Sequence, residues 1–144
     1  MASLTPIAGT LGIQNATHLL RRATFGPQLQ DIQNFSNLTA AAAFQQLIQP
    51  QATPAPPIDF LTGTDWVYPN AVDPANFSST ISKYTSSWWI DNMRISGANL
   101  TERMVWFYHT HFPMIISRIQ SRPQFSLDYL RLLRFYALGN YKDL

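Results

Sequence analysis

The chain has 144 residues and a mass of 16.4 kDa, which suits one compact domain with a hydrophobic core and is too short for two ordinary ones. It contains no cysteine, which excludes a disulfide scaffold, a thiol nucleophile and a cysteine-ligated metal centre. Charged residues make up 12% of the chain and the net charge is +2, so we expect no nucleic-acid partner. No apolar run approaches the roughly 20 residues of a membrane span, and residues 1–12 lack the pattern of a secretory signal.

Residues 1–49 predict an N-terminal cluster of three short helices. The first covers 15–25 with Asn15 as its N-cap, and the second covers 27–35. Thr39 is a suitable cap for the third, 40–49, which is rich in alanine and ends at a proline. The residues expected on the buried face of this third helix are Phe44, Leu47 and Ile48.

Residues 50–76 predict a long loop between the third and fourth helices. Six of the ten prolines in the chain fall between positions 50 and 74, which disfavours regular helix. A loop of this length in a compact domain is usually functional or disordered. Trp66 within it indicates that part of the segment packs against the rest of the chain.

Residues 77–144 predict the main helices. The first is capped by Ser78 or Ser79 and stops at Gly97, and a short helical piece is expected over 114–120. A last full helix opens at Pro123. Residues 140–144 resemble the cap and first turn of a further helix, so we expect the chain to be cut rather than finished. The inward-facing residues predicted for the last full helix are Leu127, Leu130, Leu133, Tyr136 and Ala137.

The stretch from 99 to 112 predicts a helix that is apolar on almost every side. Asn99 followed by Glu102 has the spacing of a capping box, and Pro113 ends the helix. A helix that is apolar all round is expected in the centre of a bundle. No strand pattern or repeat is present, so the sequence predicts an all-α bundle of about six or seven helices forming one unit over 1–144.

His109 and His111 are the candidate metal ligands, because imidazole is a common ligand for divalent metals. Positions i and i+2 on a helix lie about 200° apart, so both rings reach one ion only if the helix unwinds before Pro113. Alternatively, the two rings bind carbonyl oxygens or interact with the negative end of the helix. Both interpretations remain open on the residues alone.

Glu102 and His109 are the candidate catalytic pair, with His111 as a third member. Glu102, Trp106 and His109 share one helix face at i, i+4 and i+7, so the acid and the imidazole can flank a cleft. Glu102 is the only glutamate in the chain, and the capping box gives it an alternative structural role.

Two further groups are candidates for binding. Arg21 and Arg22 lie beside His18, and arginine forks bind carboxylates or phosphates. Their alternative role is structural, with one arginine in solvent and the other at the helix C-terminus. Trp88 and Trp89 cannot both face one core, so one of them, together with Trp66, can meet a glycan or a protein partner.

Three stretches together resemble the N-terminal third of a bacterial family called domain of unknown function 1800. They are residues 18–27 (HLLRRATFGP), 100–112 (LTERMVWFYHTHF) and 133–144 (LRFYALGNYKDL). Tyr136 stands where the family pattern usually has a histidine. The resemblance implies a longer, mostly helical, exported protein of several hundred residues, of which this chain is a truncated N-terminal part.

The resemblance also implies how the candidate residues act together. His109, His111, His18 and Glu102 would contribute to a hydrolase-like or divalent-metal site that the missing C-terminal part, or a companion chain, completes. The alternative function is a non-catalytic scaffold or a module that binds a glycan or a protein. A cut chain with bare apolar helix faces is also expected to self-associate.

Overall fold

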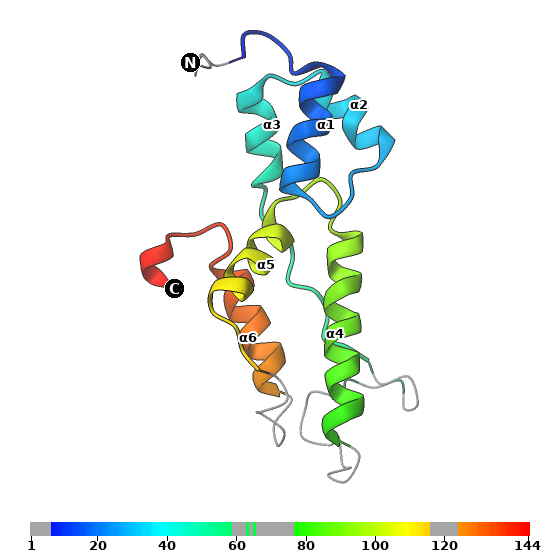
Figure 1. Ribbon diagram of the computed structural model, residues 1–144, viewed down its shortest axis with the longest axis vertical. Coiled ribbons are helices and arrows are strands. Elements are labelled where there is room, and N and C mark those ends of the chain that lie inside the picture. Colours follow the sequence, from blue (N-terminus) through cyan, green and yellow to red (C-terminus); the bar gives the residue numbers. More distant parts are fainter. Residues whose placement is uncertain (1–6, 59–62, 64, 66–76, 116–123) are drawn as a thin grey trace.

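The computed structural model describes residues 7–58, 63, 65, 77–115 and 124–144, with the side chains of 77–83 and 124 excepted. Within these ranges the chain is all-α with no strand, as predicted (Figure 1). None of the helices described is long and apolar enough to cross a bilayer. The helices are α1 (Gly12–Ala23), α2 (Leu29–Ser36), α3 (Ala40–Leu47), α4 (Phe77–Ile95), α5 (Thr101–His111) and α6 (Gln124–Phe135), followed by the 3₁₀ turn η2 (Tyr141–Asp143).

The N-terminal cluster of three helices is confirmed, with one of its two predicted caps. Thr39 caps α3, since its hydroxyl oxygen accepts a hydrogen bond from the backbone N–H of Ala42 at 3.3 Å. The prediction for Asn15 is wrong, because α1 begins at Gly12 and places Asn15 inside its first turn. The amide of Asn15 donates to the carbonyl oxygen of Leu11 at 2.8 Å instead.

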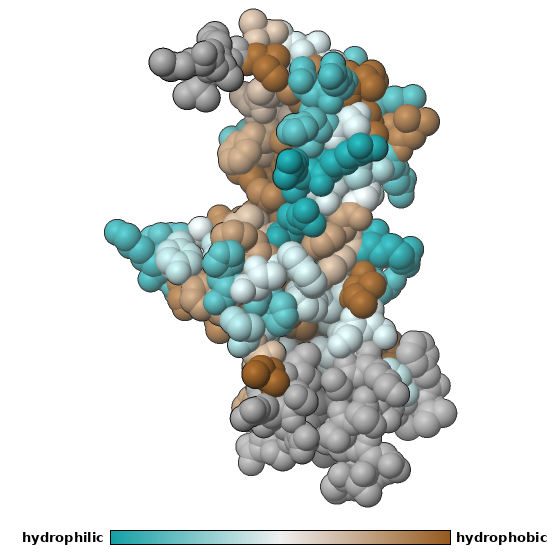
Figure 2. Space-filling view, viewed as in Figure 1, coloured by the Kyte–Doolittle hydropathy of each residue, from teal (hydrophilic) through white to brown (hydrophobic). Residues whose placement is uncertain are grey.

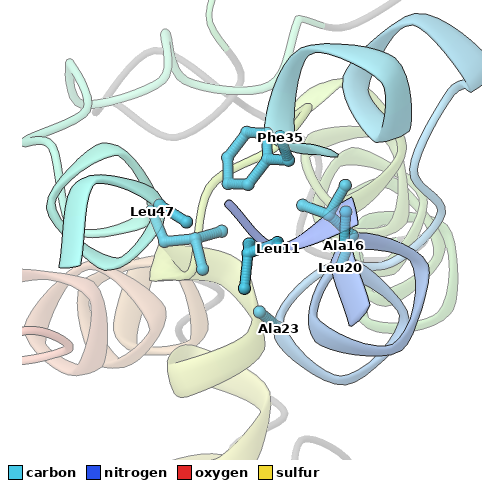
Figure 3. Packing of buried hydrophobic residues seen from close by; sticks show 7 residues of the cluster. Leu11, Ala16, Leu20, Ala23, Phe35 and Leu47 are labelled. Atoms are coloured by element: carbon cyan, nitrogen blue, oxygen red, sulfur yellow. The ribbon is translucent and has the colours of Figure 1, made fainter. Parts of the chain in front are cut away.

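A first hydrophobic core lies among α1, α2 and α3 (Figure 3). Phe35 of α2 is its largest fully buried side chain. The predicted face of α3 is partly wrong, because Phe44 is 53% exposed while Ala43 and Leu47, four residues apart, face the core. The buried members of this cluster are Leu11, Ala16, Leu20, Ala23, Phe35, Ala43 and Leu47. The backbone N–H of Leu100 donates to the carbonyl of Leu47 at 2.9 Å, which joins this core to the start of α5.

Residues 50–58 of the proline-rich segment contain no helix and contact both α4 and α6 through hydrogen bonds. The contact with α4 is made by Trp88, whose indole N–H donates to the carbonyl oxygen of Ala55 at 2.8 Å. Trp66 and most of the segment lie outside the described residues. Helix α4 begins at Phe77, so Ser78 and Ser79 lie in its first turn rather than at a cap before it.

Helix α5 corrects the expectation of a helix buried on all sides. Val105 and Tyr108 are buried, whereas Trp106 is 43% and Phe107 46% exposed. One face of α5 therefore packs inside the molecule and an aromatic face remains on its surface.

A second core lies between α5 and α6, and the tryptophans of α4 pack against it. Of the inward positions predicted for the last helix, Leu127, Leu130, Leu133 and Ala137 are buried and Tyr136 is half-buried, and α6 itself ends at Phe135, before the last two of these positions. The buried residues of this core are Val105, Tyr108, Leu130, Leu133 and Ala137, and Trp88, Trp89, Met104, Tyr129 and Leu144 pack against them. Asn140 caps η2 as predicted, its side-chain oxygen accepting from the backbone N–H of Lys142 at 3.1 Å. Met114 and Ile115 are not helical, and the rest of the short helix expected there lies outside the described residues.

The two cores sit at different levels of an elongated molecule. Helices α1, α2 and α3 form one group, and α5 and α6 pair below them beside the long α4 (Figure 1). The space-filling view narrows between the two groups, and polar and apolar residues alternate over the face shown (Figure 2). The candidate residues of α5 lie in the lower group, where α4, α5 and α6 meet.

Candidate functional site

His109 lies in the last turn of α5 and is half-buried. Its ring atom Nδ1 lies 3.0 Å from the hydroxyl oxygen of Tyr129, which α6 supplies. The Tyr129 hydroxyl donates its single hydrogen to the carbonyl oxygen of Phe112. Since that hydrogen is already used, Tyr129 accepts from His109, and the proton of the neutral imidazole resides on Nδ1.

The opposite ring nitrogen of His109, Nε2, is left as the acceptor of the neutral ring. It has no hydrogen-bond partner among the described residues. Burial lowers the pKa of His109 below its ordinary 6.5, which keeps the ring neutral at pH 7. Burial also raises the pKa of Tyr129, so its hydroxyl keeps the proton that it donates. The side chain is thus a neutral base with one basic nitrogen open.

Aromatic rings hold the imidazole of His109 from two helices. The ring of Trp89 in α4 meets it edge to face, with centroids 4.9 Å apart. Trp106, one turn earlier in α5, lies 6.2 Å from the His109 ring and 5.6 Å from Trp89. These contacts restrict rotation of the ring and supply the burial that lowers its pKa.

His111 has different partners from His109, although only two residues separate them. Its side chain is exposed, its Nδ1 lies 2.8 Å from the carbonyl oxygen of Phe107, and its ring packs on that of Phe107 at 4.2 Å. Helix α5 stays regular through His111, so the unwinding that would bring both rings to one ion does not occur. The described residues contain no group of three or more His, Asp or Glu side chains that could hold a metal.

Glu102 is buried in an ion pair with Arg134 of α6 and is not part of a capping box. The two side chains are only 3% and 13% exposed. Leu100 is the N-cap residue of α5 and supplies no side-chain cap, while the side-chain oxygen of Asn99, one residue earlier, accepts from the backbone N–H of Thr101 at 2.8 Å. The capping-box prediction is therefore wrong, because the only glutamate of the chain instead compensates a buried arginine. Burial lowers the pKa of Arg134, which stays charged beside this carboxylate.

The predicted binding residues of α1 lie away from the imidazole. His18, Arg21 and Arg22 are exposed, and their side chains form no ion pair with another described residue. The contact between this segment and α5 is made by Phe25, whose ring lies 6.3 Å from that of Trp106. The guanidinium of Arg103 lies over the Phe25 ring, 5.0 Å from its centroid.

Sequence reasoning missed Tyr129, Arg134 and Phe25 as parts of this region. A sole glutamate on an apolar helix carried a usable signal, since a buried carboxylate requires a cationic partner. Nothing in the local sequence identifies Tyr129, because its contact with His109 spans 20 positions.

These features define an all-α chain that carries an oriented, neutral histidine beside a buried Glu–Arg pair. A family model described as "Protein of unknown function (DUF1800)" matches residues 18–144, and the chain belongs to this family. The resemblance inferred from the three sequence stretches is thereby confirmed. Comparison with curated proteins and with solved structures gave no match.

Proposed function

We propose that this chain supplies His109 as the general base of a hydrolase-type site in a larger protein. The proposal rests on two successive hydrogen bonds. The Nδ1–H of His109 donates to the Tyr129 hydroxyl, and that hydroxyl donates to the carbonyl oxygen of Phe112, which leaves Nε2 of His109 as an unprotonated base. A general base must be unprotonated at the working pH, and burial of His109 favours this form.

In the proposed reaction, Nε2 of His109 takes a proton from a water molecule or a hydroxyl group as that oxygen attacks the substrate. The proton later passes to the leaving group, so the imidazole returns to its neutral form. Tyr129 keeps the ring in one tautomer and one orientation, which is the role of the third residue in nucleophile–base–orienter arrangements. Trp89 and Trp106 exclude water from the other sides of the ring.

The groups that bind substrate and stabilise the developing charge are proposed to come from a C-terminal part of the same protein or from a companion chain. Two features support a partner at this place. Nε2 has no hydrogen-bond partner among the described residues, and Trp106 and Phe107 of the same helix leave aromatic surface exposed. Glu102 is assigned a structural role, because its carboxylate is buried in an ion pair with Arg134. Export of the larger protein stays a prediction from the family resemblance.

A hydrolysis assay on a family protein that contains this chain and its C-terminal continuation tests the proposal. p-Nitrophenyl acetate, phosphate and sulfate serve as substrates for the native protein and for His109→Gln. Loss of a general base lowers kcat by roughly 100-fold or more. His111→Gln is the matched control, because that imidazole lies two residues away and binds only its own helix, and it is expected to keep nearly full activity.

Two results would contradict the proposal. One is turnover that persists in His109→Gln. The other is the absence of turnover by the native protein on all three ester classes. Stoichiometric metal that disappears with His109→Ala would assign Nε2 to a metal instead, because a histidine whose Nδ1–H is held by a neighbour is also a suitable metal ligand.

A further inference from the structure

A small cavity lies where α4, α5 and α6 meet, with Trp89 among the residues that line it. Its volume is about 10 Å³, which is close to the smallest volume that can hold one water molecule. The residues that line it are Trp88, Trp89, Asn92, Glu102, Val105, Leu130, Arg131 and Arg134.

Two residues that line the cavity carry polar groups with unused hydrogen-bonding capacity. The indole N–H of Trp89 is buried and has no partner. The carboxylate of Glu102 is paired with Arg134, and a carboxylate has about four acceptor positions, so some remain. Asn92 is also buried and adds an amide to the same wall. A donor, an acceptor and an amide around a volume of this size meet the requirement of two to four polar partners for a buried water.

We propose that a single bound water molecule bridges the indole N–H of Trp89 and the carboxylate of Glu102. The water accepts from Trp89 and donates to Glu102, and Asn92 provides the third contact. The volume of the cavity suits one water molecule. The bridge connects α4 to the ion pair that joins α5 and α6.

The bridge makes Trp89 a positioning residue for His109. The water fixes one edge of the indole, and the ring of His109 packs against that indole with centroids 4.9 Å apart. A continuous series of contacts then runs from Arg134 through Glu102, the water and Trp89 to His109. This consequence rests on the proposed role of His109, whereas the water site itself does not.

Nuclear magnetic resonance of the 144-residue chain tests the water directly. The indole Hε1 of Trp89 is expected to show a cross-peak to water with the sign of a long-lived contact. This cross-peak should disappear in Trp89→Phe and persist in Trp88→Phe. Trp88 is the matched control because it is the adjacent tryptophan and its N–H already donates to Ala55. A Trp89 indole without such a cross-peak in the unaltered chain would overturn the proposal, whether or not either variant folds.

The positioning role has a separate measurement. In Trp89→Phe the pKa of His109, followed by its ring proton shifts, should rise toward its ordinary 6.5, because the bridged indole no longer covers the ring. In Trp88→Phe the pKa of His109 should be the same as in the unaltered chain. An unchanged His109 titration in Trp89→Phe would remove the positioning role. Neither experiment measures hydrolysis, so failure here and failure of the general-base proposal are distinguishable.

Discussion

At the scale of single residues, the chemistry depends on which nitrogen of His109 carries the proton. Tyr129 decides this because its own hydrogen is directed to the Phe112 carbonyl. A neighbouring carboxylate would have raised the pKa of the imidazole, whereas a neutral phenol leaves burial as the dominant effect. His109 is therefore oriented without being charged.

The lowered pKa of His109 predicts how stability changes with pH. Its folded-state pKa lies below the unfolded value of 6.5, so between these two values the unfolded chain binds more protons. The contribution of neutral His109 to the free energy of unfolding is therefore complete above pH 6.5. It is lost as the pH falls through the folded-state pKa of this residue. Urea unfolding between pH 7.5 and 5 should show a smaller decrease in the free energy of unfolding for His109→Gln than for the native chain. His18→Gln, on the exposed surface of α1, is the control, and an equal decrease in all three chains would contradict the prediction.

At the scale of elements, the Glu102–Arg134 pair joins α5 to α6 from inside the molecule. Replacing Glu102 with alanine leaves a buried guanidinium without its counter-charge, which should lower the free energy of unfolding by about 3–5 kcal/mol. The double variant Glu102→Leu/Arg134→Met should be more stable than either single variant, because no uncompensated charge then remains. Urea unfolding measures both effects.

The surface pair of Asp91 and Arg94 in α4 supplies the control for the buried pair. Its side chains are 56% and 72% exposed, so Asp91→Ala should change the free energy of unfolding by only about 0–1 kcal/mol. Equal losses for Asp91→Ala and Glu102→Ala would show that the Glu102 pair does not join the helices.

Phe25 joins the N-terminal helices to α5, and its removal tests that connection. The ring contacts Trp106 and lies under the guanidinium of Arg103. Phe25→Ala should lower the free energy of unfolding by about 1–2 kcal/mol, from the aromatic pair and the cation–π contact together. Phe44→Ala, an exposed phenylalanine of α3, should stay within about 0.5 kcal/mol of the native value. A loss in the free energy of unfolding that is larger for Phe44→Ala than for Phe25→Ala would contradict the assignment of this connection to Phe25.

The helices themselves were largely predictable because local signals specify them. Thr39 and Asn140 cap the elements that follow them, and the period of leucines in α6 identifies its buried face. The predictions failed where one polar residue had a second, non-local use. Glu102 has capping-box spacing, yet α6 brings Arg134 to it from 32 positions away, and a buried counter-charge outweighs a cap. The Tyr129 contact has the same non-local origin, so the sequence indicated His109 without indicating its orientation.

At the scale of the whole molecule, large apolar side chains remain on the surface of α5, α6 and the residues that follow α6. Phe135 is 79% exposed, and Leu132, Phe107 and Phe112 are each more than 40% exposed. We expect exposed apolar surface of this kind to bind another protein segment. It agrees with the proposal that a further part of the protein, or a companion chain, covers this end.

This surface predicts self-association of the isolated chain. Sedimentation velocity should show a concentration-dependent rise in mean mass for the native chain, and Phe135→Asp should reduce it because a charge enters the apolar surface. Ile13→Asp, at an exposed isoleucine of α1, is the control and should associate like the native chain. A native chain that stays monomeric over a hundredfold range of concentration would contradict the prediction.

The tautomer of His109 is the most direct test of how the site is built. Long-range ¹H–¹⁵N spectra of the histidine-labelled chain at pH 7.5 distinguish a protonated ring nitrogen from one with a free electron pair. For His109 we expect a protonated Nδ1 and an unprotonated Nε2, and a mixture of both tautomers in Tyr129→Phe. A proton on Nε2, or a doubly protonated ring at this pH, would show that His109 does not present the open base on which the proposed function rests.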